Sequence, residues 1–318
     1  MMKLRVAVAG AGVFGRHHMR VLRGLETAEL AGVFDIDPAR AAQAAADFEV
    51  PAFASLEALA ANADAAIVAV PTTAHAATGC QLLNAGLDVL IEKPIAPTLE
   101  EADQLLAAAA RNGKLIQVGH LERFNPAVEA LAAKITVPLF FEIHRLSLFT
   151  PRSLDVDVVL DLMIHDIDIV LALTGKMPEE VRAAGISILS KKVDIANVRL
   201  AFPGGCVANL TASRVSTEKV RKVRLFQPHE YISIDYADQK GIAFRVSPQK
   251  QIGFEPFLIQ QDEPLRREVA HFVDCVTQRT RPRVDGLEAR RALAVALDIL
   301  EKIEAHAAII SATLAAQQ

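Results

Sequence analysis

The chain has 318 residues, of which 52% are hydrophobic, so it is long enough to bury a large core and to form two domains. Its 34 basic and 38 acidic side chains give a formal net charge of -4, which provides no bulk attraction to nucleic acid or to anionic lipid. The three cysteines form no metal-binding spacing, and no segment has the roughly 20 strongly apolar residues that span a bilayer, so we expect a cytoplasmic protein without a membrane span.

The first part of the chain, from residue 3 to about residue 119, alternates between two kinds of segment. Short β-branched runs ("LRVAVAG", "ELAGVFD", "AAIVAVP", "DVLIEKP" and "LIQVG") are separated by Ala- and Leu-rich amphipathic runs. Continuous apolar strands joined by helical crossovers are typical of a parallel sheet that is covered on both faces. The sequence therefore predicts a first α/β domain over residues 1–120.

The rest of the chain, residues 121–318, has a different pattern and is predicted to form a second domain. A helix near "RFNPAVEALAAK" leads to the run "LFFEIHRLSLF" and then to a helix containing "DLMIHDID", which Gly175 is expected to terminate. Residues 180–247 contain several strand-like runs with a turn signal at "PGG", which indicates a mostly antiparallel sheet. The tail is helical by periodicity and ends in a long Ala-rich segment after Gly286. A cleft between two domains is where a ligand is expected.

The glycine-rich run "GAGVFG" follows the first predicted strand directly and opens a helix. In this context the first glycine permits a tight turn, the second lets the backbone approach a pyrophosphate, and the third lets the helix pack on the strand. The second strand ends in "FDID", with Asp35 twenty residues beyond the last glycine, where a carboxylate accepts hydrogen bonds from an adenosine ribose. The predicted cofactor-binding residues of this loop are Gly10, Gly12, Val13, Phe14 and Gly15.

The choice of cofactor depends mainly on Asp35. A carboxylate at this position repels the ribose 2′-phosphate of NADP, so NAD is favoured. Arg40 is the one nearby basic residue that would reverse the preference, but "DPARAAQ" reads more simply as a helix start with a solvated arginine. The loop by itself does not exclude FAD.

Two further motifs lie at the carboxyl ends of predicted parallel strands, where open α/β sheets bind their ligands. The run "AAIVAVP" leads into "VPTTAHA", and the next run ends in "EKP". A lysine desolvated beside a cofactor stabilises a developing alkoxide, whereas a solvated loop lysine has no such role. His75 and His120 are weaker candidates, more simply explained as supporting or loop residues. The predicted cofactor-binding residues of these strand ends are Pro71, Thr72, His75, Glu92 and Lys93.

The run "DLMIHDID" places ionisable groups in an apolar segment. In a helix, Asp161, His165 and Asp168 fall at positions i, i+4 and i+7, along one face. Such a face can bind a metal, move a proton or simply be solvated. Three ligands on one helix converge poorly on a metal ion, so we predict no metal site. We interpret His165 as a proton acceptor, because imidazole is in general able to take up a proton near neutral pH.

Together, the glycine loop, the "VPTTAHA" and "EKP" strand ends and the later DxxxHxxD motif resemble the Gfo/Idh/MocA family of NAD(P)-dependent sugar and polyol oxidoreductases. The resemblance covers nearly the whole chain. It implies an N-terminal Rossmann domain, a C-terminal α/β domain whose open sheet forms an oligomer interface, and a final helix that returns toward the first domain. It also implies that Lys93, Asp161 and His165 face the substrate. Met163 departs from the glycine that the family commonly has inside DxGxH.

The segments "VGHLERFNP", "FTPRS" and "VDVVLDLMIHDIDIV" are similar to the branch of this family that oxidises C3 of UDP-N-acetylglucosamine. The resemblance implies a nucleotide-sugar substrate and a homodimer or homotetramer, and the pyrophosphate of such a substrate would suit arginine forks. A free polyol, inositol or other sugar remains the alternative substrate. A non-catalytic NAD-sensing partner protein is the alternative function, against which the presence of both Lys93 and His165 argues. The residues predicted to bind the substrate are Arg123, Asn125, Arg152 and Arg214.

Overall fold

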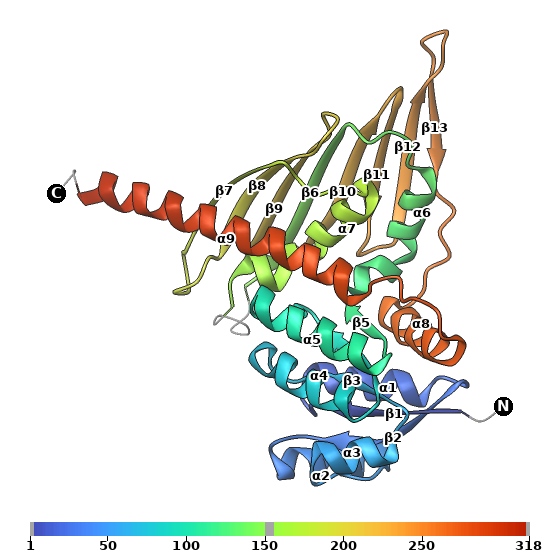
Figure 1. Cartoon of the computed structure of the whole chain (residues 1–318). Coiled ribbons are helices and arrows are strands. Elements are labelled where there is room, and N and C mark those ends of the chain that lie inside the picture. The colour runs from blue at the N-terminus through green and yellow to red at the C-terminus, as the bar shows by residue number, and fades with distance from the viewer. Residues whose placement is uncertain (1–2, 150–155, 316–318) are drawn as a thin grey trace. The chain divides into compact units, whose positions relative to one another are not determined.

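The computed structural model of the protein describes residues 3–149 and 156–315 (Figure 1). Within it the chain divides into two compact units. The first unit comprises Met1–Leu121 and Glu263–Arg290, and the second comprises Glu122–Asp262 and Arg291–Gln318. The division falls inside the last helix, so this helix contributes its first residues to one unit and the remainder to the other.

The first unit contains a five-stranded parallel sheet with the strand order β2-β1-β3-β4-β5. A parallel bridge between Val33 and Ala52 marks one more short extended segment beside β2. With it the order matches that of a Rossmann fold, and the predicted α/β domain with a parallel sheet is confirmed. The strands are β1 (Leu4–Ala9), β2 (Ala28–Phe34), β3 (Ala65–Val68), β4 (Asp88–Glu92) and β5 (Ile116–Gly119).

Helices cover this sheet, and short polar side chains begin three of them. Asp37, Ser55 and Thr98 each accept a hydrogen bond from a main-chain N–H of the first turn, which satisfies donors that a helix start leaves unpaired. Apolar residues of α1 and α8, including Met19 and Phe272, pack together against one face of the sheet. The helices of the unit are α1 (Val13–Arg23), α2 (Pro38–Phe48), α3 (Leu56–Asn62), α4 (His75–Asn84), α5 (Leu99–Asn112) and α8 (Pro264–Gln278), with the 3₁₀ turn η1 (Thr72–Ala74).

The second unit contains an eight-stranded sheet with the order β13-β12-β11-β10-β6-β9-β8-β7. All neighbouring strands are antiparallel except β6 and β9, which are parallel, so the predicted mostly antiparallel sheet is confirmed. The strands are β6 (Phe140–Leu148), β7 (Glu180–Ile186), β8 (Ile195–Ala201), β9 (Val207–Ser216), β10 (Val220–Gln227), β11 (Glu230–Asp235), β12 (Lys240–Val246) and β13 (Ile252–Pro256).

Helices α6 (Pro126–Lys134) and α7 (Ile164–Thr174) and the middle part of α9 (Gly286–Ala315), between Ala292 and Ile303, pack on one face of this sheet (Figure 1). Inward-facing residues of alternate strand positions, such as Phe141, form a single core with residues of these helices, such as Ile299. The 3₁₀ turn η2 (Leu121–Phe124) precedes α6. The opposite face of the sheet carries aromatic side chains that are partly exposed.

The helix predicted over "DLMIHDID" begins irregularly. Val159–Met163 forms a π-helical turn (η3), in which the N–H of Ile164 donates to the carbonyl oxygen of Val159, and only then does the α-helical segment α7 begin. The expectation of a regular α-helix through this motif is therefore corrected. π-helical turns are rare in proteins, and those that occur are often found at functional sites. Gly175 ends α7 with a φ of 67°, as predicted.

The predicted Ala-rich helix after Gly286 is confirmed as α9, which has 30 residues. Ala292, Ala296 and Ile303 on this helix belong to the core of the second unit. Among the helices of residues 3–149 and 156–315, none has the length and apolarity that crossing a membrane requires.

Candidate active site

The glycine loop joins β1 to α1 in the first unit. Gly10 has a φ of 104°, and a Cβ there would lie 2.4 Å from the carbonyl oxygen of Ala69 at the end of β3. A Cβ on Gly15 would collide with the carbonyl oxygen of Gly10. Gly12 has no atom within 4 Å of its would-be Cβ, so the space next to it is open. The loop thus needs glycine at its two packed positions and leaves its middle accessible to a ligand.

Asp35 ties this loop to the end of β2. Its carboxylate accepts hydrogen bonds from the main-chain N–H of Ala11, at 2.8 Å, and of Asp37, at 2.9 Å. Arg40 lies near it, with 3.6 Å between a guanidinium nitrogen and a carboxylate oxygen, and its side chain is 53% exposed. Arg40 is therefore an ion-pair partner of the acidic side chains at the helix start and is more than a solvated residue.

The loop region fits a dinucleotide. The first N–H groups of a helix have no acceptor within the helix, and they favour a negative charge such as a pyrophosphate. Val13 and Phe14, in the first turn of α1, are 54% and 52% exposed, which is unusual for large apolar side chains and leaves them available to a bound molecule. With open space at Gly12 and a carboxylate at Asp35, the residues present suit the phosphate and ribose groups of NAD.

His75 connects the ends of two parallel strands. One ring nitrogen lies 2.8 Å from the carbonyl oxygen of Pro94, and the other lies 3.0 Å from that of Val70. Burial lowers the pKa of His75, although both carbonyl groups act in the opposite direction. The ring is buried, and its contacts explain it as a link between the two loops. Pro71 and Thr72, next to it in sequence, lie at the start of η1 and are partly or fully accessible.

The EKP motif ends β4. Glu92 is buried, and its carboxylate contacts the ring of His18 on α1, with 2.7 Å between Nε2 and Oε1. The other carboxylate oxygen accepts the main-chain N–H of Lys93 at 3.3 Å. Lys93 is partly exposed, and the peptide bond that joins it to Pro94 is cis. The lysine is thus the accessible residue of the motif, while the glutamate turns into the core.

His165 and Asp161 belong to the second unit. Asp161 lies within the π-helical turn and is partly exposed, whereas His165 lies in the first turn of α7 and is 7% exposed. Asp168 is buried on the same helix and pairs with Arg123, with 3.4 Å between Nη1 and Oδ1. Asp168 is thus a pairing residue, and the role of Arg123 in substrate binding stays a prediction.

A buried charged cluster holds α7 against the sheet. Arg145 on β6 binds both carboxylate oxygens of Asp166, at 2.8 and 2.9 Å, and also Glu122, at 3.2 Å. The hydroxyl of Tyr236 donates to Asp166 at 2.8 Å. Burial alone would lower the pKa of Arg145, but Asp166, Tyr236 and Glu122 outweigh it and raise that pKa well above its usual value. Asp166 is the neighbour of His165 in sequence, so the cluster fixes the helix that carries the histidine.

Sequence reasoning missed this cluster, although one signal was present. In "FFEIHRLSL" the alternation of a strand places Arg145 on the same side as Phe141 and Ile143, which are buried. An arginine on the apolar side of a strand needs a buried acidic partner. The partners come from distant segments, and the local pattern does not identify them.

The remaining predicted substrate residues have structural contacts of their own. Asn125 is buried and begins α6, accepting the N–H of Ala127 and donating to the carbonyl oxygen of Tyr236. Arg214 is buried and donates to the carbonyl oxygen of Val156. Arg152 lies outside the described residues.

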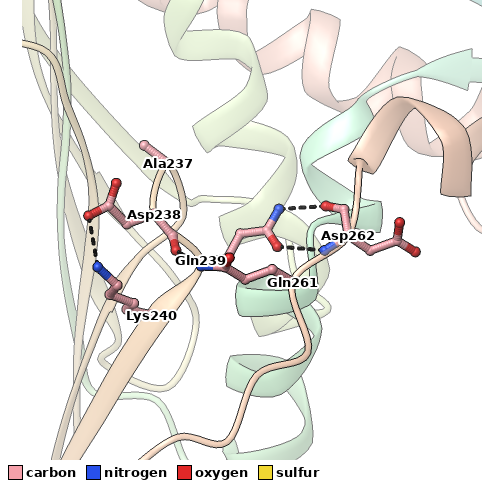
Figure 2. A pocket seen from close by; sticks show the side chains of 6 residues that line it. All are labelled: Ala237, Asp238, Gln239, Lys240, Gln261 and Asp262. Carbon is pink, nitrogen blue, oxygen red and sulfur yellow. Dashed lines mark hydrogen bonds and ion pairs between the residues drawn. The ribbon is translucent and has the colours of Figure 1, made fainter.

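A polar pocket in the second unit involves none of the predicted residues (Figure 2). It lies at the turn between β11 and β12, where Gln239 exchanges two hydrogen bonds with the main chain of Asp262. The side chains of this pocket bond chiefly to one another and to main-chain groups. We therefore interpret the pocket as a structural contact between the β11–β12 turn and the segment before α8. Within the described residues, no group of three or more His, Cys, Asp and Glu side chains is arranged to hold a metal ion.

Two domain families match the chain. The first, described as an oxidoreductase family with an NAD-binding Rossmann fold, matches residues 4–120. The second, the Gfo/Idh/MocA C-terminal domain, matches residues 141–227.

Individual proteins of known activity match over almost the full length. The chain is 36% identical over 311 residues to the UDP-N-acetylglucosamine 3-dehydrogenase of Acidithiobacillus ferrooxidans, which covers 96% of this chain and 99% of that protein. A solved structure of that dehydrogenase has a TM-score of 0.91 to this chain, with the same coverage of 96% and 99%. The scyllo-inositol 2-dehydrogenase (NAD(+)) of Bacillus subtilis is 26% identical over 319 residues, with 90% of each chain covered.

Proposed function

The chain belongs to the Gfo/Idh/MocA family of NAD-dependent oxidoreductases, and from this premise we propose that it oxidises the C3 hydroxyl of UDP-N-acetylglucosamine or a similar nucleotide sugar. Membership confirms three sequence-based predictions, namely the family, the oxidoreductase activity and NAD as the cofactor. The substrate proposal is supported by one observation above all, the likeness to a UDP-N-acetylglucosamine 3-dehydrogenase along nearly the whole of both chains.

The reaction removes a hydride and a proton from a secondary alcohol. The residues of the glycine loop would hold the pyrophosphate of NAD, and NAD would supply the acceptor for the hydride. The C–H bond at the reacting carbon breaks with its electron pair, the O–H bond loses its proton, and a carbon–oxygen double bond forms. We assign the proton to the imidazole of His165, because imidazole titrates near neutral pH.

Two further side chains complete the proposed chemistry. Lys93, accessible at the end of β4, would place a positive charge on the substrate oxygen as negative charge develops there. Asp161, in the π-helical turn, would orient His165 or hold a neighbouring sugar hydroxyl. We assign cofactor binding to residues 1–120 and substrate binding to residues 121–318.

A free polyol is the alternative substrate, because inositol dehydrogenases are among the relatives. A panel assay separates the two: purified protein and NAD are mixed with UDP-N-acetylglucosamine, UDP-glucose, myo-inositol or glucose, and NADH is followed by absorbance. Turnover of UDP-N-acetylglucosamine with a 3-keto product by mass spectrometry supports the proposal. Turnover of inositol or glucose without any UDP-sugar contradicts it, and no turnover at all with retained NADH binding would favour a sensing role.

We also propose a homodimer or homotetramer formed through the sheet of the second unit. On the sheet face opposite the helices, five aromatic rings form one row across five strands, with neighbouring ring centroids 4.9 to 5.9 Å apart. Two of these rings are 38% and 61% exposed, and water contact with such a row is unfavourable. The row consists of Phe140, Phe226, Tyr231, Phe244 and Phe254. A monomer by light scattering at working concentration would contradict this proposal.

A cytoplasmic location is proposed from the cysteines. Cys80, Cys206 and Cys275 are all unpaired, and two of them are buried. Burial raises the pKa of each thiol, which keeps it in the unreactive protonated form. Unpaired cysteines are typical of a reducing compartment.

A further inference from the structure

One face of the first sheet, under α1 and α8, is apolar except at the end that carries the EKP motif. Four buried polar side chains meet there from four different elements: His18 from α1, Glu92 from β4, Gln117 from β5 and Glu268 from α8. Their exposed fractions are 0%, 7%, 0% and 0%. Buried charge is costly and needs an explanation, and none of the four has a role in the reaction proposed above.

Glu92 is the bridge within this group. One carboxylate oxygen lies 2.7 Å from the ring of His18, and the other accepts the main-chain N–H of Lys93 at 3.3 Å. The carboxylate also packs against Gly119 on β5, where an added Cβ would lie 3.0 Å from its oxygen. The glutamate therefore has one position, which links the helix of the glycine loop to the main chain of the lysine.

We infer that His18 is a positioning residue for Lys93: it holds the Glu92 carboxylate against the main-chain N–H of the lysine and so fixes the direction in which the lysine leaves the strand end. The inference rests on the proposed role of Lys93. A lysine side chain is a flexible stem of four carbons. The position of its ammonium group therefore depends on the backbone from which the stem extends. Pro94 restricts the lysine backbone from the other side.

The charge balance of the group supports this role. Burial by itself raises the pKa of Glu92, but the hydrogen bond and charge of His18, and then the charges of Lys93 and His75, outweigh burial and lower it. The acid is thus kept as a carboxylate inside the core, where a neutral acid would be the usual outcome. Without the His18 contact, Glu92 would lose the largest of the influences that lower its pKa, so its pKa should rise.

Glu268 is held in the opposite state. Burial, and after it the charge of Glu92, raise its pKa well above the usual value. Within the described part of the chain, neither of its carboxyl oxygens has a hydrogen-bond partner, and Gln117 contacts only its main-chain carbonyl oxygen, at 3.0 Å. Two neighbouring buried acids each disfavour the charged form of the other. Glu268 therefore keeps a proton, and Glu92 stays a carboxylate that accepts the main-chain N–H of Lys93.

The test compares the pH dependence of kcat/KM, with the substrate found in the panel assay, in three variants. His18→Leu removes the donor to Glu92, and we expect about a tenfold loss of kcat/KM at pH 7 and a new acidic limb, because a charge-assisted hydrogen bond is lost. His18→Gln retains an N–H donor and should show no new limb. His17→Leu, an exposed histidine on the same helix, is the matched control and should match the unmodified protein.

An unchanged profile in His18→Leu would overturn the inference, as would the same new limb in His18→Gln. If His18→Leu does not fold, Gly119→Ala provides the second route, because its Cβ displaces the Glu92 carboxylate directly. That variant should lower kcat/KM with a shifted acidic limb, and a normal profile would overturn the inference.

A double-mutant cycle separates this inference from the proposed function. If Lys93→Met has normal turnover, the role of Lys93 is wrong. If Lys93→Met is impaired but the loss from His18→Leu simply adds to it, the lysine acts and His18 does not position it. Coupling, in which His18→Leu costs little once Lys93 is methionine, supports the inference.

Discussion

In the first unit, the buried Glu268 carboxyl has no hydrogen-bond partner among the described residues, and Glu92, which precedes Lys93, has one side-chain partner, His18. In the second unit, next to His165, both oxygens of Asp166 are bonded to Arg145. The paired cluster behaves as a rigid support, since a fully satisfied polar network has one arrangement. The incompletely paired group keeps a protonation state that depends on its surroundings, so it is the more sensitive to pH and to substitution.

The largest effect is expected from His165→Asn, which removes the proposed proton acceptor and keeps the Arg145–Asp166 cluster that supports its helix. We expect kcat to fall by roughly 10²–10⁴, the usual contribution of general acid–base catalysis, while NADH binding is retained. The acidic limb of the rate profile should disappear. Steady-state kinetics and NADH fluorescence measure both quantities. Near-normal turnover, or inactivation by a chelator with recovery on zinc addition, would show that the histidine has another role.

Arg145→Met tests the paired cluster directly. Removing the guanidinium that is bonded to both acids leaves Asp166 and Glu122 buried without this ion-pair partner, so the free energy of unfolding should fall by roughly 3–5 kcal/mol. Urea denaturation followed by circular dichroism measures this. The matched control is Arg182→Met on β7, where the arginine is 77% exposed, and its effect should stay within about 0.5 kcal/mol. A similar loss of unfolding free energy in both variants would show that the buried, paired arginine contributes no more than the exposed one.

A smaller effect is expected from Asp194→Asn, which changes a buried carboxylate held mainly by main-chain N–H groups, together with the Ser190 hydroxyl and Arg214. Burial raises the pKa of Asp194, but hydrogen bonds from the N–H and hydroxyl of Ser190 and from the N–H groups of Ile188 and Leu189 outweigh burial and lower it to about 2. The folded pKa lies below the usual value of 3.8, so the stabilisation is complete above pH 3.8 and is lost as the pH falls through about 2.

At pH 7 Asp194→Asn should therefore lower the free energy of unfolding by about 1–3 kcal/mol, and the difference should shrink toward pH 2. Denaturation at several pH values measures this. Asp238→Asn, at a side chain that is 65% exposed, is the control and should change little. A difference between Asp194→Asn and the unmodified protein that is independent of pH would contradict the assignment.

The smallest effect is expected at Asp35, a carboxylate of the first unit that main-chain groups do satisfy. NAD(H) should bind several-fold more tightly than NADP(H), because the carboxylate repels a 2′-phosphate. Asp35→Ser should narrow the difference, and Arg40, already close to this position, would help by attracting the phosphate. Titration of both cofactors by fluorescence measures the ratio. Equal or reversed affinities in the unmodified protein would refute the ribose assignment.

Features that depend on neighbouring residues were predictable. The glycine spacing of Gly10, Gly12 and Gly15 specifies a tight turn and a helix start, and Asp35 and Lys93 follow apolar strands at a fixed distance. Gly175 ended its helix as expected because only glycine adopts a positive φ without cost. The same motifs identified the family, and the family in turn implied the oxidoreductase activity and NAD as the cofactor.

Features that depend on distant residues were not predictable in this way. β6 lies between β10 and β9, and this order depends on pairing between strands that are distant in sequence. The sequence pattern also did not predict β13. The π-helical turn before α7 is a small local deviation that the sequence pattern does not distinguish from a regular helix.

By itself, the sequence determined the fold class of each half, the cofactor loop and the identity of Lys93, Asp161 and His165 as candidates, because these depend on local spacing and on chain-wide resemblance. Only the tertiary structure decided which charges are buried and which partner each one has. His18 meets Glu92 across 74 positions of the chain, and Arg145 meets Asp166 across 21. Whether a buried acid is charged depends on the groups that surround it in space, and the order of residues along the chain does not contain that information until the chain has folded.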